Sequence, residues 1–356
     1  MWPYWVLFLI PALMAVQRRP RMNALWRPAW SAELWLFWLF VVSAIGLRYE
    51  VGGDWESYLS YLNTAADLNF WQIFALGDPG YIAINWFSSQ LGLGIVGVNL
   101  ISGAIFASGL IVFSRTLARP WLALAVAVPY IVIVIAMGYV RQGIALGLIM
   151  HGLAWLPRGN YWRYLFWVLV AATFHKSAIV MAPFALLVLK RKQIHTLLIF
   201  SLVSSLGFIL LLKDSIEYFV SAYIEAGYTS DGALIRLSMN ALPALIFLFL
   251  INCFDFNIIQ KRIWTWFSIL TFVSLGAFFI SPSTTAVDRI ALYHVPLQLV
   301  VFASLPDVMS RRFGTKKNEW LIAIIGYYAS VQFVWLMYAI HAFAWLPYRL
   351  YPFAVI

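Results

Sequence analysis

Long apolar segments recur along the whole chain, and short polar breaks with basic residues separate them. Hydrophobic residues make up 63% of the 356 residues and charged residues only 11%, whereas soluble domains have roughly 45–50% apolar and about 25% charged residues. A chain of this composition cannot bury its apolar surface in water. Because helices satisfy their own backbone groups inside a lipid bilayer, the pattern predicts an all-α, polytopic membrane protein.

The polar breaks divide the sequence into about twelve transmembrane or re-entrant helices, which we assign to a single membrane domain of residues 1–356. A helix needs about 20 apolar residues to cross the hydrocarbon core. Residues 80–94 are too short and too broken by glycine for a crossing, so we expect a re-entrant or surface helix there. The expected crossings are 2–16, 32–47, 95–114, 120–138, 143–156, 161–174, 177–189, 194–212, 236–252, 263–280, 290–305 and 320–341.

Basic residues are shared unequally between the two sides of this arrangement. Alternate connections carry most of the 24 lysines and arginines, for example in residues 18–27, 190–192 and 311–317. Lysine and arginine are enriched in cytoplasmic loops, so we expect these connections in the cytoplasm and both chain termini outside. The same bias explains the net charge of +10 without a nucleic-acid partner.

Two long connections lie on the outer side, at residues 48–94 and 213–235. In the first, Tyr58, Leu62, Ala65 and Leu68 recur at helical spacing, and aromatic residues follow them. An amphipathic helix with aromatic residues suits the membrane interface. The single cysteine, Cys253, allows no internal disulfide, and we expect it to be a packing residue.

Cations on the outer side oppose the positive-inside bias, so they need a separate explanation. A single arginine there can extend to lipid phosphates. If the helices form a bundle, however, several such cations can converge on one outward-facing cavity. Guanidinium groups match phosphate oxygens, so the set predicts an anion site. Five cations stand at the outer ends of five apolar segments: Arg48, Arg141, Lys176, Arg236 and Arg289.

Other polar residues accompany two of these cations. His175 and Ser177 flank Lys176 between two short apolar segments. A lone histidine in an apolar setting is usually a packing residue, but three adjacent polar groups need partners together, which favours a functional role. Asp288 is expected to pair with the neighbouring Arg289.

Four short motifs resemble the EpsG family of bacterial exopolysaccharide and capsule synthesis. They are R-x-x-V-G-x-D-W-x-x-Y at residues 48–58, D-P-G-Y at 78–81, Y-V-R-Q-G-I-A at 139–145 and F-H-K-S-A at 174–178. The resemblance runs in order from about residue 45 to R-I-A-L-Y at 289–293, and residues 194–260 match it only loosely.

The resemblance implies a GT-C-like membrane glycosyltransferase, related in role to Wzy-type O-antigen polymerases. Such an enzyme transfers a glycan from undecaprenyl pyrophosphate to another lipid-linked repeat, on the outer face of the bacterial inner membrane. The five outward cations would then bind pyrophosphate as the anomeric bond breaks. Because the donor carries its own anionic leaving group and outward cations can stabilise it, no bound metal is obligatory. The sequence also has no D-x-D pair and no ligand cluster with suitable spacing, and no cofactor is expected.

A carboxylate or imidazole must take the proton from the acceptor hydroxyl. Asp54 is the first candidate for this general base, His175 the second and Glu56 the third. Asp54 also stands where a helix would begin, so an alternative role is to cap that helix. The residues expected to contact sugar or acceptor are Trp55, Tyr58, Gln142 and Tyr293.

Two other functions also use outward cations and a lipid-linked saccharide. One is a flippase or transporter, which would need charges along the middle of its helices, and these are almost absent. The other is an O-antigen-ligase-like transferase, which adds one glycan to a different acceptor. In each case the partners are the undecaprenyl-linked oligosaccharide and the bilayer, with polysaccharide export or chain-length proteins as further candidates.

Overall fold

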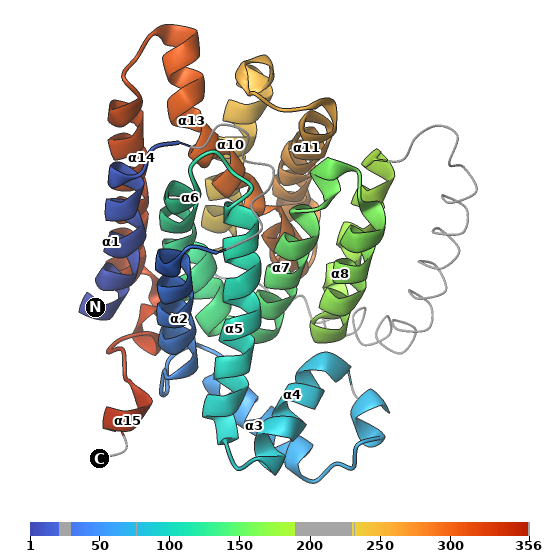
Figure 1. The fold of residues 1–356 in the computed structure, drawn as a ribbon. Coiled ribbons are helices and arrows are strands. Elements are labelled where there is room, and N and C mark those ends of the chain that lie inside the picture. The colour runs from blue at the N-terminus through green and yellow to red at the C-terminus, as the bar shows by residue number, and fades with distance from the viewer. Residues whose placement is uncertain (21–29, 76, 189–229, 231, 355–356) are drawn as a thin grey trace.

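The computed structural model describes residues 1–20, 30–75, 77–188, 230 and 232–354. In these ranges every regular element is a helix, as expected, apart from an isolated antiparallel bridge between Arg48 and Leu350. Most helices run side by side as a bundle (Figure 1). The elements are α1 (Trp2–Gln17), α2 (Ala32–Gly46), α3 (Trp55–Ala66), η1 (Gln72–Ala75), α4 (Pro79–Gln90), α5 (Gly94–Ser114), α6 (Pro120–Ala127), η2 (Val128–Ala136), α7 (Val140–Leu153), η3 (Leu156–Arg158), α8 (Tyr161–Phe174), η4 (Lys176–Val188), α10 (Ala233–Leu250), η6 (Ile251–Cys253), α11 (Ile258–Ile280), α12 (Thr284–Ala291), η7 (Leu292–His294), α13 (Pro296–Phe313), α14 (Lys317–Tyr338), η8 (Ile340–Ala344) and α15 (Tyr351–Ala354).

Four of these helices are long and apolar enough to cross a membrane: α5, α10 with η6, α11 and α14. A fifth crossing results if α12–η7 and α13 form one span, which would be bent by 41°. α1, α2, η4 and the continuous run α6–η2 are apolar but shorter. The expected number of about twelve crossings is therefore not confirmed. The expected crossing at 194–212 and most of the outer loop 213–235 lie outside the described residues.

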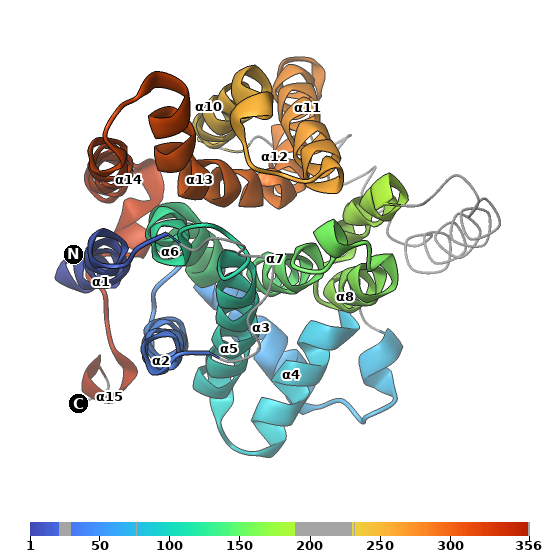
Figure 2. The same cartoon turned by 45° about the horizontal axis from the view of Figure 1, so that its top comes forward.

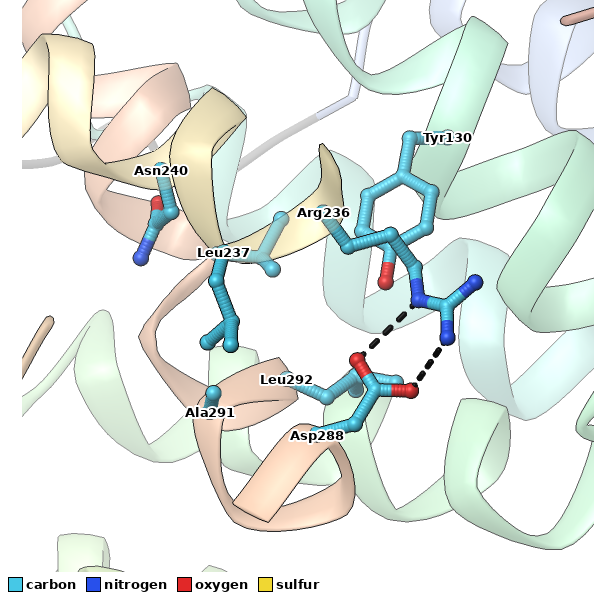
Figure 3. Close-up of a pocket in the computed structure, with 8 residues that line it drawn as sticks. Tyr130, Arg236, Leu237, Asn240, Asp288, Ala291 and Leu292 are labelled. Carbon is cyan, nitrogen blue, oxygen red and sulfur yellow. Dashed lines mark hydrogen bonds and ion pairs between the residues drawn. The ribbon is translucent and has the colours of Figure 1, made fainter. Parts of the chain in front are cut away.

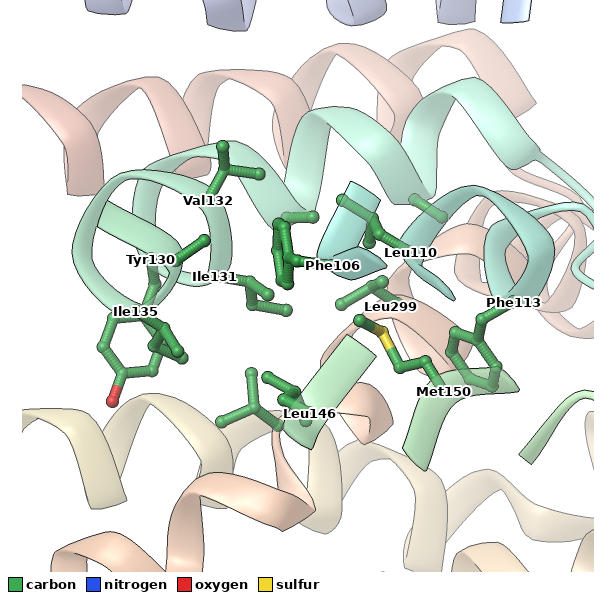
Figure 4. Close-up of a cluster of buried hydrophobic side chains, with 14 of the residues drawn as sticks. Phe106, Leu110, Phe113, Tyr130, Ile131, Val132, Ile135, Leu146, Met150 and Leu299 are labelled. Carbon is green, nitrogen blue, oxygen red and sulfur yellow. The ribbon is translucent and has the colours of Figure 1, made fainter. Parts of the chain in front are cut away.

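The centre of the bundle consists of α5, α6 with η2, α7 and α13. Phe106 and Leu110 of α5 meet Ile131 of η2 and Leu299 of α13 in one buried apolar cluster (Figure 4). α5 and α7 approach very closely. A Cβ atom on Gly109 of α5 would lie only 1.9 Å from the carbonyl oxygen of Gly147 on α7. Glycine at such a crossing allows direct backbone contact between helices.

Large apolar side chains also cover the outside of the bundle. Phe249 of α10 is 79% exposed, Val273 of α11 is 57% exposed and Val334 of α14 is 54% exposed. In water such surfaces are rare on a monomer, whereas lipid is the natural contact of apolar side chains on long helices. These faces therefore fit a lipid environment.

Residues 48–94 form a small unit of α3, η1 and α4 at one end of the bundle (Figures 1 and 2). α3 packs against α4, and α4 packs against α5 and α8. The short helix expected within residues 80–94 is α4, which lies across the end of the bundle and is too short to cross a membrane.

The turn between α13 and α14 lies at the opposite end of the bundle (Figure 1). There Asp307 of α13 accepts two hydrogen bonds from Arg119, at 2.9 and 3.1 Å, and its Oδ1 lies 2.9 Å from Nζ of Lys317. The side chain of Arg119 is only 7% exposed. One carboxylate thus neutralises two cations and joins α6, α13 and α14.

Replacing Asp307 with Asn should destabilise the protein, because Arg119 would stay buried without its counter-charge. Breaking one partner of a buried ion pair costs about 3–5 kcal/mol, and we expect the lower end because Lys317 is half exposed. The free energy of unfolding in detergent, followed by tryptophan fluorescence, measures this loss. Glu319→Gln is the control, since its pair with Lys316 is exposed and 3.8 Å long. Equal losses of unfolding free energy in both variants would contradict the role of Asp307 as the counter-charge of buried Arg119.

Candidate active site at the outer end of α7

A break in the chain between η2 and α7 organises the outer end of the bundle. η2 is a π-helix that ends at Ala136, and α7 begins at Val140. The hydroxyl of Tyr58 on α3 accepts a hydrogen bond of 2.8 Å from the amide of Val140, and it donates one of 3.4 Å to the carbonyl of Gly138. Tyr58 therefore binds the broken backbone and fixes α3 beside the start of α7.

The loop before α3 also packs on this break. Gly52 has a φ of 115°, which disfavours other residues, and its amide donates to the carbonyl of Ala344 at 2.8 Å. A Cβ atom there would lie 2.5 Å from the carbonyl oxygen of Met137. The glycine of the first motif is thus required by a left-handed backbone and by a close approach.

Arg141, in the first turn of α7, forms an ion pair with Asp78 at the start of α4. Nη1 of Arg141 lies 2.7 Å from Oδ2 of Asp78, and the two side chains are 27% and 11% exposed. The guanidinium also lies over the ring of Tyr61, 4.8 Å from its centroid. Burial raises the pKa of Asp78, while the charges of Arg141 and Lys176 oppose that rise. The pair joins the outer unit to the bundle.

A chain of hydrogen bonds connects α7 with the η4 and α12–η7 segments. Nε2 of Gln142 donates to the carbonyl of Arg289 at 2.6 Å, and Gln142 also bonds the hydroxyl of Tyr293. The hydroxyls of Tyr293 and Ser177 lie 3.2 Å apart, and Ser177 Oγ lies 2.8 Å from Nδ1 of His175. Gln142 and Tyr293, which were expected to contact substrate, and His175, a candidate base, are thus connected through Ser177.

Asp54 is half-buried and lies within the electrostatic reach of two cations. It occupies the N-cap position of α3, but its side chain makes no capping hydrogen bond. Burial raises the pKa of the Asp54 carboxyl, while Arg289 and then Arg141 oppose this rise. The same two arginines interact electrostatically with His175. Asp54 and His175 thus share electrostatic interactions with Arg141 and Arg289, and the missing capping hydrogen bond gives no support to the capping role.

Arg236 and Asp288 form a bidentate ion pair of 2.6 and 3.0 Å between α10 and α12 (Figure 3). Ser230 bonds both partners. The expected pairing of Asp288 with Arg289 is therefore wrong, because the Asp288 carboxylate faces α10. The adjoining pocket, which Tyr130 also lines, has a cavity volume of only about 10 Å³, far less than the roughly 300–1,000 Å³ of typical ligand sites. Arg236 thus holds α12 in place.

Arg48 is fully buried, although it was expected in the anion site. Its guanidinium donates to the carbonyls of Val51 and Ile45 and, at 3.0 Å, to Oδ1 of Asn99 on α5. These partners tie the end of α2 to the following loop and to α5. Arg48 therefore organises the first motif from within.

The remaining predicted residues of α3 occupy different faces. Trp55 is buried and packs edge-on against Tyr49, with ring centroids 5.9 Å apart. Glu56 is exposed on the other face of the helix. Asp78 was not among the residues predicted for the site, although it begins the D-P-G-Y motif.

The part of the chain that the structure describes holds no group of three or more His, Cys, Asp or Glu residues arranged to bind a metal ion. At the site itself, three cations accompany two carboxylates: Arg141, Lys176, Arg289, Asp54 and Asp78. The first turn of α7 lies at the same place, and helix N-termini favour anions. This arrangement can bind an anionic group beside a carboxylate of raised basicity.

Comparison with known proteins agrees with the order of the motifs. No curated protein and no solved structure matches the chain significantly, so the GT-C-like architecture remains a prediction. The model of the EpsG family matches residues 34–350, a range that includes all four motifs and every residue of the site. With its long apolar helices, the chain is a multi-pass membrane protein, and it belongs to the EpsG family.

Proposed function

We propose that this protein polymerises lipid-linked oligosaccharide repeats, transferring a glycan from undecaprenyl pyrophosphate to another lipid-linked repeat. Membership of the EpsG family points to an exopolysaccharide-polymerase-like glycosyltransferase. The observation that carries the finer proposal is that Arg141 and Arg289 both interact electrostatically with Asp54, next to the 2.7 Å ion pair of Arg141 with Asp78. It supplies cations for a pyrophosphate leaving group and a base for the incoming hydroxyl at one place.

In the proposed reaction, the acceptor hydroxyl oxygen attacks the anomeric carbon of the donor glycan. The bond between that carbon and the pyrophosphate oxygen breaks, and undecaprenyl pyrophosphate leaves with the electron pair. Asp54 takes the proton of the hydroxyl. Arg141 and Arg289 stabilise the charge that develops on pyrophosphate, with Lys176 beside them. This step requires no bound metal.

The other residues have supporting roles in this proposal. His175, held by Ser177, is the alternative base, and Glu56, the third candidate, is exposed. Arg236 holds α12 through Asp288. Gln142 and Tyr293, both buried, orient the backbone that carries Arg289.

The positions of the charges favour a transferase over a flippase. The candidate groups gather at the end of the bundle where α3 and α4 lie, and the turn with Arg311, Arg312, Lys316 and Lys317 lies at the other end (Figure 1). By the positive-inside bias, we place the site outside the bacterial inner membrane. A flippase would need polar groups at both ends of a path, whereas chemistry on one leaflet needs only one site.

Purified protein in liposomes with lipid-linked repeats should produce a ladder of products that differ by one repeat. A single added unit would instead indicate a ligase, and no covalent product would indicate a flippase.

Arg141→Ala should abolish the ladder. Because this change leaves Asp78 buried without its partner, the double variant Asp78→Asn with Arg141→Gln is the informative control. If Arg141 served only to pair with Asp78, the double variant would regain activity, whereas a phosphate-binding role predicts that it stays inactive.

Asp54→Asn should lower kcat by about 10²–10⁴-fold, the usual contribution of a general base. The base acts when deprotonated, so wild-type activity should fall as the pH drops through the pKa of Asp54. Because burial raises that pKa, the loss of activity should begin at a pH above the ordinary aspartate pKa of about 3.9. This pH dependence should be absent in Asp54→Asn. Measurement of kcat against pH tests this, and full activity in both Asp54→Asn and His175→Ala would refute our choice of base.

Asp288→Asn should raise KM for the lipid-linked donor more than it lowers kcat. When the carboxylate of Asp288 is removed, Arg236 no longer holds α12. Arg289 on that helix then shifts away from the pyrophosphate. Asp307→Asn is the matched control, because it breaks a comparable ion pair at the other end of the bundle. Unfolding free energy and steady-state kinetics of both variants separate the two effects. A similar change of KM in both would show that Asp288 contributes only stability.

A further inference from the structure

Three large aromatic side chains project from the short segment between α3 and α4. Trp71 is 79% exposed, Phe74 is 63% exposed and Phe70 is 49% exposed. Their rings contact one another, with the centroid of Phe70 lying 5.5 Å from that of Trp71 and 5.7 Å from that of Phe74. We call these three residues the aromatic lip.

The local structure holds the lip in this orientation. Oδ1 of Asn69 accepts hydrogen bonds from the amides of Trp71 and Gln72, which closes a tight turn. Ile73 points inward and is buried against Ala65 of α3 and Ile82 of α4. A residue pattern that buries the aliphatic side chain and exposes three aromatic ones needs a cause, because burial of aromatic surface is usually favourable.

The surroundings of the lip identify its partner. Residues 68–75 and 77 carry no ionisable side chain. α4 packs against α8, and Gly80 near the start of α4 lies against Thr173 at the end of α8. The apolar face of α8 that ends there exposes Trp162 (59%), Phe166 (58%) and Leu169 (50%). η1 lies on the α8 side of α4 in both views (Figures 1 and 2).

The exposed apolar face of α8 thus ends against α4, on the side of α4 where η1 lies, and we take this as the level where the lipid-facing surface ends. Tryptophan and other aromatic side chains are enriched at this level of a bilayer. We propose that Phe70, Trp71 and Phe74 insert into the interfacial region of the lipid leaflet on the side of α3 and α4. Phe74 and Asp78 are only four residues apart, so the inserted lip also sets the depth of the Asp78–Arg141 ion pair relative to the membrane surface.

A nitroxide label at position 71 tests the insertion. Trp71→Cys is made in a Cys253→Ser background, labelled, and reconstituted in liposomes of phosphatidylglycerol and phosphatidylethanolamine. The collision rates of the label with oxygen, which enters lipid, and with a water-soluble nickel chelate are then compared. Labels at Leu242→Cys, on the exposed apolar face of α10, and at Glu56→Cys, on the exposed face of α3, provide the lipid and water references.

We expect the ratio of oxygen to nickel collisions at position 71 to be several-fold higher than at position 56 and closer to that at 242. A ratio equal to that at position 56 would overturn the proposal. The proposal would also be overturned if the label were exposed to water and became shielded only when the polysaccharide product is added. That result would assign the lip to glycan binding. Phe74→Cys provides a second label position if the change at Trp71 impairs folding, and neither result depends on polymerase activity.

Discussion

The 2.7 Å ion pair between Arg141 and Asp78 determines how the outer unit meets the bundle. Both groups are largely buried, and separating them would leave a charge uncompensated in surroundings of low polarity. The pair therefore fixes α4 against the first turn of α7. Tyr58 extends the connection to α3, and Gln142 extends it to α12. The positions of the candidate groups thus depend on where α7 begins.

The start of α7 depends in turn on the π-helix before it. π-helical segments are rare and occur frequently at functional sites. Where this one ends, backbone groups lose their helical partners, and in a membrane protein they must find others inside the protein. Tyr58 binds the groups of Gly138 and Val140, and the indole of Trp345 donates to the carbonyl of Ile133 at 2.8 Å. Side chains from residues 48–94 and from the C-terminal segment therefore stabilise the irregular backbone that precedes α7.

Local motifs and charge predicted the neighbourhood of the site better than they predicted individual contacts. The positive-inside bias selected Arg141 and Arg289, and both interact electrostatically with Asp54. The same argument selected Arg48, whose inward position depends on Asn99, a partner that no local pattern reveals. The number of crossings stays unconfirmed for a related reason. Apolar composition does not distinguish the buried, 14-residue α7 from a helix that faces lipid, because either environment accepts the same side chains.

The carboxylates of the outer face differ in how far their charge is already compensated. Asp288 is held by Arg236 and Ser230, and Asp78 is paired with Arg141, whereas Asp54 does not cap its helix and interacts with Arg289 and Arg141 through space. In the proposed reaction, a bound pyrophosphate would compensate the charge of those arginines. Their effect of lowering the pKa of Asp54 would then weaken, and the effect of burial would remain. Binding of the donor would thus make Asp54 a stronger base, and release of the pyrophosphate product would reverse the change. The cations that hold the leaving group therefore also couple the strength of the base to the presence of the donor.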